Sequence, residues 1–185
     1  MFTNKNKSLM LYEVEESQYK YLYQIPPKKN RYICLKTETT GLDIENDKAI
    51  KLSAVEIING ELTGDSRVVF LNEDEDKEKS KSNKKNIKKN LIDFINFLDD
   101  CVIFSHNSIF HSRVLNKVLM SYGFQSIEKT QFRCSLRIFR ILINEIAPYI
   151  DKRYLGLIQC CQILHINMNE NNLGNDCWKV SSKVL

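Results

Sequence analysis

The chain has 185 residues and a formal net charge of +4 at pH 7. Hydrophobic residues make up 43% and charged residues 27%, a balance typical of a globular domain, which argues against a disordered or fibrous chain. No apolar run reaches the roughly 18 residues of a membrane span, so we expect no membrane contact. The mild basicity permits a polyanionic partner without requiring one.

The six cysteines show neither a C-x-x-C pair nor the spacing of a zinc site. Most of them lie in apolar runs and are predicted to be small core residues. No signal peptide precedes them, so we expect free thiols in a reducing compartment and an intracellular, cytoplasmic location.

Residues 1–30 begin polar, continue through a tyrosine-rich patch and close on a turn-forming cluster, Pro26-Pro27-Lys28-Lys29-Asn30. We predict an N-terminal extension here, packed on the domain or on a protein partner. The remaining residues, 31–185, are predicted to form one folded domain.

The first part of this domain has the periodicity of strands. Strands are predicted at 32–36 and at 49–58, where aliphatic and β-branched residues are concentrated. Asn59-Gly60 is the typical dipeptide of a tight hairpin turn, so 61–71 is predicted to return as a third, antiparallel strand.

The segment 72–90 has almost no apolar residue, and an acidic block in it precedes a lysine-rich one. We predict a charged, solvated loop that leads into a helix. The alternative is a flexible lysine arm that binds phosphates.

Helices and one more strand follow. Helical spacing is found at 91–98, 109–122 (ended by Gly123), 135–146, 154–164 and from Asp176 onward, and a short buried strand is predicted at 101–104. This order predicts an α/β domain with a mixed central sheet, in which a three-stranded antiparallel meander and parallel strands are flanked by helices.

The end of the first strand carries a recognisable motif, Leu35-Lys36-Thr37-Glu38-Thr39-Thr40-Gly41-Leu42. It resembles the opening motif of the DEDDh family of 3′→5′ exonucleases, the family of the proofreading subunit of bacterial DNA polymerase. The family's pattern is apolar, Asp, any, Glu, Thr, Thr, Gly, Leu. This chain therefore keeps Glu38 and has Lys36 in the place of the aspartate.

Two further motifs follow in the family's order. Residues 102–111, Val-Ile-Phe-Ser-His-Asn-Ser-Ile-Phe-His, resemble the second motif, with His111 in the place of its aspartate. Residues 171–177, Asn-Asn-Leu-Gly-Asn-Asp-Cys, resemble the third, with Asn171 in the place of its histidine and Asp176 retained. The resemblance covers about 31–185 and implies a ribonuclease H-like fold.

The family resemblance implies a two-metal site that hydrolyses phosphodiesters with a histidine as general base. Of its five catalytic positions, this chain keeps only Glu38 and Asp176. Imidazole is a poor ligand for Mg²⁺, and asparagine cannot act as a base. An ammonium about 4 Å from a divalent ion repels it by several kcal/mol. We therefore expect no catalytic residue, no metal site and no cofactor, the ancestral Mg²⁺ or Mn²⁺ pair having been lost.

Lys36 is expected to act as a counter-ion that bridges Glu38 and Asp176. The alternative is that its side chain points into solvent. Trp178 is predicted to be a core residue of the last helix, with exposure as a partner anchor as the competing interpretation.

Three functions compete. The first is an inactive exonuclease-like domain kept as a binding or scaffold module on RNA or a ribonucleoprotein particle such as the ribosome. The second is a residually active exonuclease that uses His111 and a non-magnesium ion, and the third is a protein-interaction domain. Nucleic-acid contacts are predicted from Thr39, Thr40, Leu42, His106 and Asn107. For His106, local packing is the competing interpretation.

Overall fold

The computed structural model describes residues 31–59, 61–71, 77–146, 148–151 and 155–166. The predicted N-terminal extension, the third motif with Asn171 and Asp176, and the predicted last helix with Cys177 and Trp178 lie outside these residues. Among the described residues, no helix combines the length and hydropathy needed to cross a bilayer.

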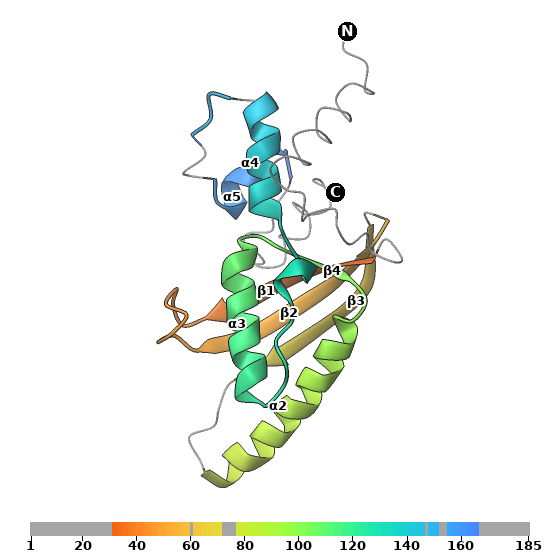
Figure 1. The fold of residues 1–185 in the computed structure, drawn as a ribbon, viewed down its shortest axis with the longest axis vertical. Helices are drawn as coiled ribbons and strands as arrows, with labels where there is room; N and C mark the ends of the chain where they lie inside the picture. The colour runs from red at the N-terminus through yellow and green to blue at the C-terminus, as the bar shows by residue number, and fades with distance from the viewer. Residues whose placement is uncertain (1–30, 60, 72–76, 147, 152–154, 167–185) are drawn as a thin grey trace.

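A five-stranded mixed sheet forms the centre of the domain (Figure 1). Its strands, in the order β3-β2-β1-β4-β5, are β3 (Glu61–Phe70), β2 (Ala49–Ile58), β1 (Arg31–Thr39), β4 (Val102–Ser105) and β5 (Phe132–Cys134). The first three strands pair antiparallel, and β4 and β5 run parallel to β1. The predicted α/β fold with a meander and parallel strands is thus confirmed.

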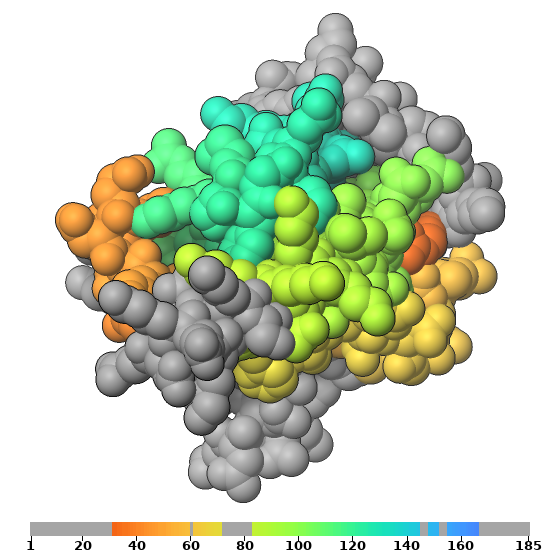
Figure 2. Space-filling model, turned by 90° about the horizontal axis from the view of Figure 1, so that it is seen from below, coloured from red at the N-terminus to blue at the C-terminus, as the bar shows by residue number. Residues whose placement is uncertain are grey.

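Four α-helices and one 3₁₀ turn complete the described fold. They are α2 (Lys77–Phe97), α3 (Ser108–Ser121), η2 (Lys129–Gln131), α4 (Ser135–Ile146) and α5 (Leu157–Ile163). Helices α2 and α3 lie against one face of the sheet, and α4 extends beyond its edge (Figure 1). In the space-filling view, α2 (yellow-green) lies beside β3 (yellow), and residues 40–48 (orange) project at one side (Figure 2).

The alternation of β1 decides which side chains enter the main core. Successive side chains of a strand point to opposite faces, so Ile33, Leu35 and Thr37 face the helices. Ile33 and Leu35 are fully buried in a cluster with residues of β2, β4, α2 and α3. Lys36 and Glu38 consequently belong to the opposite face.

A second, smaller core joins α4 and α5 through Phe139, Ile143, Leu155, Cys160 and Cys161. Leu157 of α5 also packs on the sheet face opposite α2 and α3, against Cys34 and Ile57. The five cysteines of the described part are buried and form no disulfide with one another, as their apolar surroundings predict.

The predicted charged loop at 72–90 requires a correction, because α2 begins at Lys77 and the segment is helical from there on. Ile87, Leu91 and Phe94 are buried against the sheet at helical spacing. From Ile87 onward, one buried apolar residue in each turn is enough to hold this charged helix on the core. These few apolar residues are surrounded by lysines in the sequence, so the sequence did not indicate a helix there.

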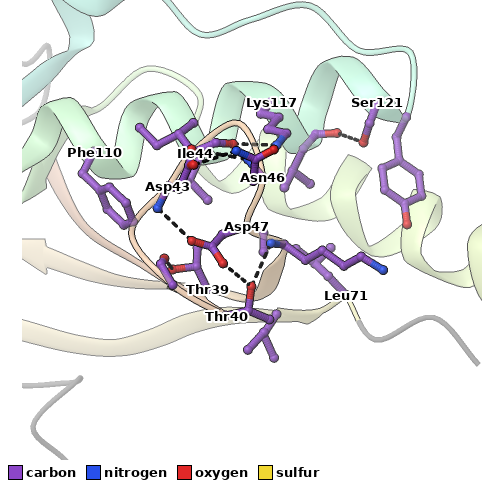
Figure 3. A pocket seen from close by; sticks show the side chains of 17 residues that line it. Thr39, Thr40, Asp43, Ile44, Asn46, Asp47, Leu71, Phe110, Lys117 and Ser121 are labelled. Carbon is purple, nitrogen blue, oxygen red and sulfur yellow. Dashed lines mark hydrogen bonds between the residues drawn. The ribbon is translucent and has the colours of Figure 1, made fainter.

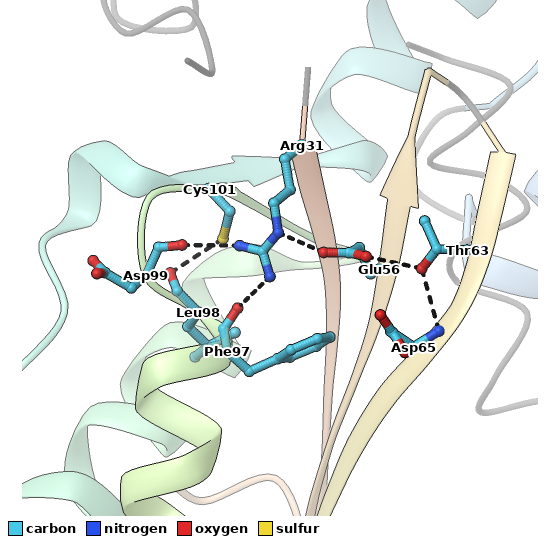
Figure 4. Close-up of polar contacts among 8 residues, drawn as sticks. All are labelled: Arg31, Glu56, Thr63, Asp65, Phe97, Leu98, Asp99 and Cys101. Atoms are coloured by element: carbon cyan, nitrogen blue, oxygen red, sulfur yellow. Dashed lines mark hydrogen bonds and ion pairs between the residues drawn. The ribbon is translucent and has the colours of Figure 1, made fainter. Parts of the chain in front are cut away.

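A partly buried ion pair fixes the start of β1 to the neighbouring strand and to the turn after α2 (Figure 4). Arg31 Nε lies 2.5 Å from Glu56 Oε1, and its two terminal nitrogens donate to the carbonyls of Asp99 and Phe97, each at 2.8 Å. Thr63 donates to Glu56 Oε2 at 2.9 Å. Burial raises the pKa of Glu56, but the hydrogen bonds from Arg31 and Thr63 outweigh it, so this pKa is lowered overall.

Candidate functional site

The end of β1 brings together three charged side chains on the sheet face opposite α2 and α3. Lys36 and Glu38 are two residues apart, and Lys51 of β2 is the cross-strand partner of Glu38. Lys36 Nζ lies 3.4 Å and Lys51 Nζ 3.1 Å from the same atom, Glu38 Oε1. The predicted contact between Lys36 and Glu38 is confirmed, while the predicted contact with Asp176 falls outside the described residues.

Both ammonium groups favour the ionised form of Glu38. The hydrogen bond from Lys51 is the largest cause of its lowered pKa, partial burial opposes the shift, and the charge of Lys36 adds to it. The Glu38 side chain is 40% exposed, so water screens these contacts and their contribution to stability is small. The cluster is therefore a local arrangement of charge and contributes little to the core.

Lys51 was not among the residues predicted from the sequence. Its proximity to Glu38 depends on the register between β1 and β2, which are joined by the irregular segment 40–48. The sequence signal available was the run of alternating residues in 49–58, which places Lys51 on one face of its strand but does not identify its partner.

His111 is held by the neighbouring strand. It lies near the start of α3, which follows Asn107 in a left-handed conformation (φ 66°). Its Nδ1 accepts hydrogen bonds from the backbone N–H of Thr37 at 3.2 Å and from the Thr37 hydroxyl at 2.8 Å. The backbone donor requires an unprotonated Nδ1, so this nitrogen has no lone pair left for a metal ion.

Burial also keeps His111 neutral. It lowers the pKa of His111 to about 4, and the charges of His106 and Lys36 act in the same direction. At pH 7 the position that holds a carboxylate in the family therefore carries no charge in this chain.

His106 and Asn107 have different surroundings. His106 is half-buried, and its Nδ1 lies 3.3 Å from the Ser135 hydroxyl. Burial lowers its pKa to about 4, with a further contribution from the charge of Arg140. This environment favours local packing for His106, whereas Asn107 is exposed and remains a predicted nucleic-acid contact.

The Thr-Thr-Gly-Leu part of the first motif forms a turn whose polar groups bond to one another (Figure 3). Thr39 donates to the Gly41 carbonyl at 2.5 Å, and Thr40 donates to Asp47 Oδ1 at 2.9 Å. Leu42 is 84% exposed. Of the three contacts predicted here, Leu42 is thus the side chain most open to a ligand.

A cavity of about 510 Å³ lies between this turn and α3 (Figure 3). Lys117 of α3 closes one side by donating to the carbonyls of Ile44 and Glu45, at 2.6 and 2.8 Å. Phe110 and Val118 contribute to its apolar wall. Its volume is in the range of small-ligand sites, and its formation depends on the fold of the 40–48 segment, which the sequence did not reveal.

Within the part of the chain that the structure describes, no three His, Cys, Asp or Glu side chains lie close enough together to hold a metal ion. Glu38 is the one acidic side chain of the family's pattern inside this part, and lysines occupy its surroundings.

Comparison with known proteins supports the fold. No protein-family model matches the chain. The PolC-type DNA polymerase III of Thermotoga maritima is 32% identical over 94 residues, which cover 45% of this chain and 7% of that polymerase. Product-bound exonuclease I superposes with a TM-score of 0.63 at 11% identity, covering 85% of this chain and 43% of exonuclease I. Escherichia coli exonuclease I in complex with a dA16 oligonucleotide gives 0.60 at 10% identity, covering 84% and 39%.

These similarities, together with the sheet order, define an exonuclease-like domain with a ribonuclease H-like fold. The chain spans less than half of exonuclease I and a small part of the polymerase. At 10–11% identity, the structural likeness establishes the fold but not the activity, which depends on the residues of the site.

Proposed function

We propose that this domain is a catalytically inactive relative of the exonucleases that acts as a binding or scaffold module on nucleic acid, with RNA or a ribonucleoprotein such as the ribosome as its partner. The observation that carries the proposal is the pairing of Glu38 with two ammonium groups.

A divalent ion coordinated by Glu38 would lie close to both lysines. Mg²⁺ binds carboxylate oxygens at about 2.0–2.1 Å. An ion bound to Oε1 would then lie next to two ammoniums that are 3.1 and 3.4 Å from that oxygen. Repulsion between these cations disfavours a metal pair here.

Residual activity with a softer ion such as Mn²⁺ would require a rearrangement of His111. Its Nδ1 is bonded to Thr37, and its ring is half-buried and neutral. Binding a metal through Nδ1 would break both Thr37 contacts. Inactivity is therefore favoured over a weak nuclease.

The test is incubation of the purified full chain with labelled single-stranded DNA and RNA in Mg²⁺ or Mn²⁺. We expect no shortening from the 3′ end. Metal-dependent digestion that disappears in Glu38→Ala would overturn the proposal. If nothing is digested and no nucleic acid is bound, a protein-interaction domain, with residues 1–30 as a candidate contact, replaces the binding half of the proposal.

A further inference from the structure

The sheet face that carries Lys36 and Glu38 continues across two more strands. Glu38 is opposite Lys51 in β2, and Lys51 is in turn opposite Phe70 in β3. Lys36, Lys51 and Phe70 thus lie on one face of three adjacent strands; we call them the Lys–Phe face. It is separate from the cavity beside α3, which lies on the other side of the sheet.

Phe70 is unusual for a large apolar residue because it is 61% exposed. It lies on the edge strand, and Lys51 Nζ is 5.8 Å from its ring centroid. Val69, the preceding residue of the strand, is buried in the core. The backbone of Phe70 is therefore fixed by packing on the far side, while its ring faces outward.

The charge of the Lys–Phe face suits a polyanion. Two ammoniums surround the single carboxylate of Glu38, so this group of side chains carries a net charge of +1. The Lys36 and Lys51 side chains remain 30% and 25% exposed. Their long stems allow each ammonium to exchange Glu38 for a phosphate oxygen without movement of the backbone.

We propose that the Lys–Phe face binds single-stranded nucleic acid without a metal ion, with Lys36 and Lys51 contacting phosphate oxygens and the Phe70 ring stacking on a base. Exposed aromatic rings beside basic groups are the general means by which proteins hold single strands. Adjacent strands are about 4.8 Å apart, so a base on Phe70 and a phosphate at Lys51 fit one nucleotide. The inference rests on the proposed binding function and names its ligand and residues.

Glu38 has two opposite effects on the binding of a phosphate at the Lys–Phe face. It holds both ammoniums near the centre of the face, but its own charge repels a phosphate. Glu38→Gln removes that charge and weakens the hold of the side chain on both ammoniums, so the proposal predicts tighter binding by this variant. A purely structural role for Glu38 would not produce a gain.

Binding is measured by fluorescence anisotropy of labelled oligouridylate and oligothymidylate, with EDTA present and salt varied. Lys36→Gln and Lys51→Gln should each weaken binding and reduce the slope of log affinity against log salt by about 0.7. Phe70→Ala should weaken binding about 10-fold or more and leave that slope unchanged. Thermal unfolding followed by circular dichroism verifies that each variant is folded.

Two matched controls lie elsewhere on the described surface. Lys88→Gln removes an ammonium that lies 5.4 Å from the Phe124 ring, and Tyr149→Ala removes an aromatic side chain that is 86% exposed. Both variants should bind as wild type does.

The outcomes separate the two proposals. If folded variants of Lys36, Lys51 and Phe70 bind as tightly as wild type, the Lys–Phe face is not the site, although the domain still binds nucleic acid. If wild type binds no oligonucleotide, both the inference and the binding half of the proposed function fail. Digestion of the oligonucleotide in Mg²⁺ would refute the proposed catalytic inactivity. It would leave the proposed binding site untouched, because binding is measured in EDTA.

Discussion

Two half-buried histidines predict that the domain loses stability in mild acid. His106 and His111 each have a folded-state pKa of about 4, against an ordinary value of 6.5. Between these values the unfolded chain binds protons that the folded chain does not, so stability falls as pH falls. One pKa unit corresponds to about 1.4 kcal/mol, which gives a loss of about 2 kcal/mol per histidine between pH 7.5 and about 5.

The lowered pKa of Glu56 acts in a different pH range. Its contribution to stability is present above its ordinary value of 4.5 and is lost only as pH falls below it. A decline in the free energy of unfolding that begins near pH 6.5 is therefore caused by the histidines. Since a typical domain is stable by about 5–15 kcal/mol, a combined loss of about 4 kcal/mol is readily measured.

The assay is urea unfolding at a series of pH values from about 7.5 to 5. His111→Gln and His106→Gln should each reduce the dependence of unfolding free energy on pH by up to about 1.4 kcal/mol per pH unit in the lower part of this range. Equal pH dependence in wild type and both variants would refute the reasoning from burial.

Three substitutions, each followed by urea unfolding, test other contacts. Lys36→Met should cost less than about 1 kcal/mol, because its carboxylate partner is exposed and keeps a second lysine; a loss of several kcal/mol would contradict this. Arg31→Met should cost about 3–5 kcal/mol because it leaves Glu56 buried and unpaired, and addition of Glu56→Gln should recover part of the loss. Gly41→Ala should cost about 1–2 kcal/mol because its new Cβ would collide with the Asp47 carboxylate and disturb its hydrogen bonds. That cost should shrink in an Asp47→Ala background.

The sequence predicted helices and strands correctly where apolar residues are frequent and regularly spaced. The bounds of β2 and α4 match the predicted 49–58 and 135–146, since each segment has a strong apolar pattern. Helix α2 was missed over 77–90 because Ile87 is the only apolar residue in that stretch, so the sequence there has no apolar periodicity that would indicate a helix.

The candidate site was predictable only for residues close in sequence. A period of two places Lys36 beside Glu38 on any strand, so that contact followed directly from the motif. Lys51 lies beside Glu38 because of the register between β1 and β2, and His111 contacts Thr37 because α3 packs on β1. Such contacts depend on the tertiary structure, and neither motif spacing nor composition determines them.

The central claim is that lysines have replaced a metal pair at this site, and calorimetric titration with Mn²⁺ tests it most directly. The variant with Lys36→Asp, His111→Asp and Asn171→His restores the family's pattern, and Lys51→Ser added to it removes the second ammonium that the structure places on Glu38. We predict no Mn²⁺ binding by wild type and clear binding by the fourfold variant when both are folded. Binding of Mn²⁺ by wild type that is lost in Glu38→Ala would contradict the account.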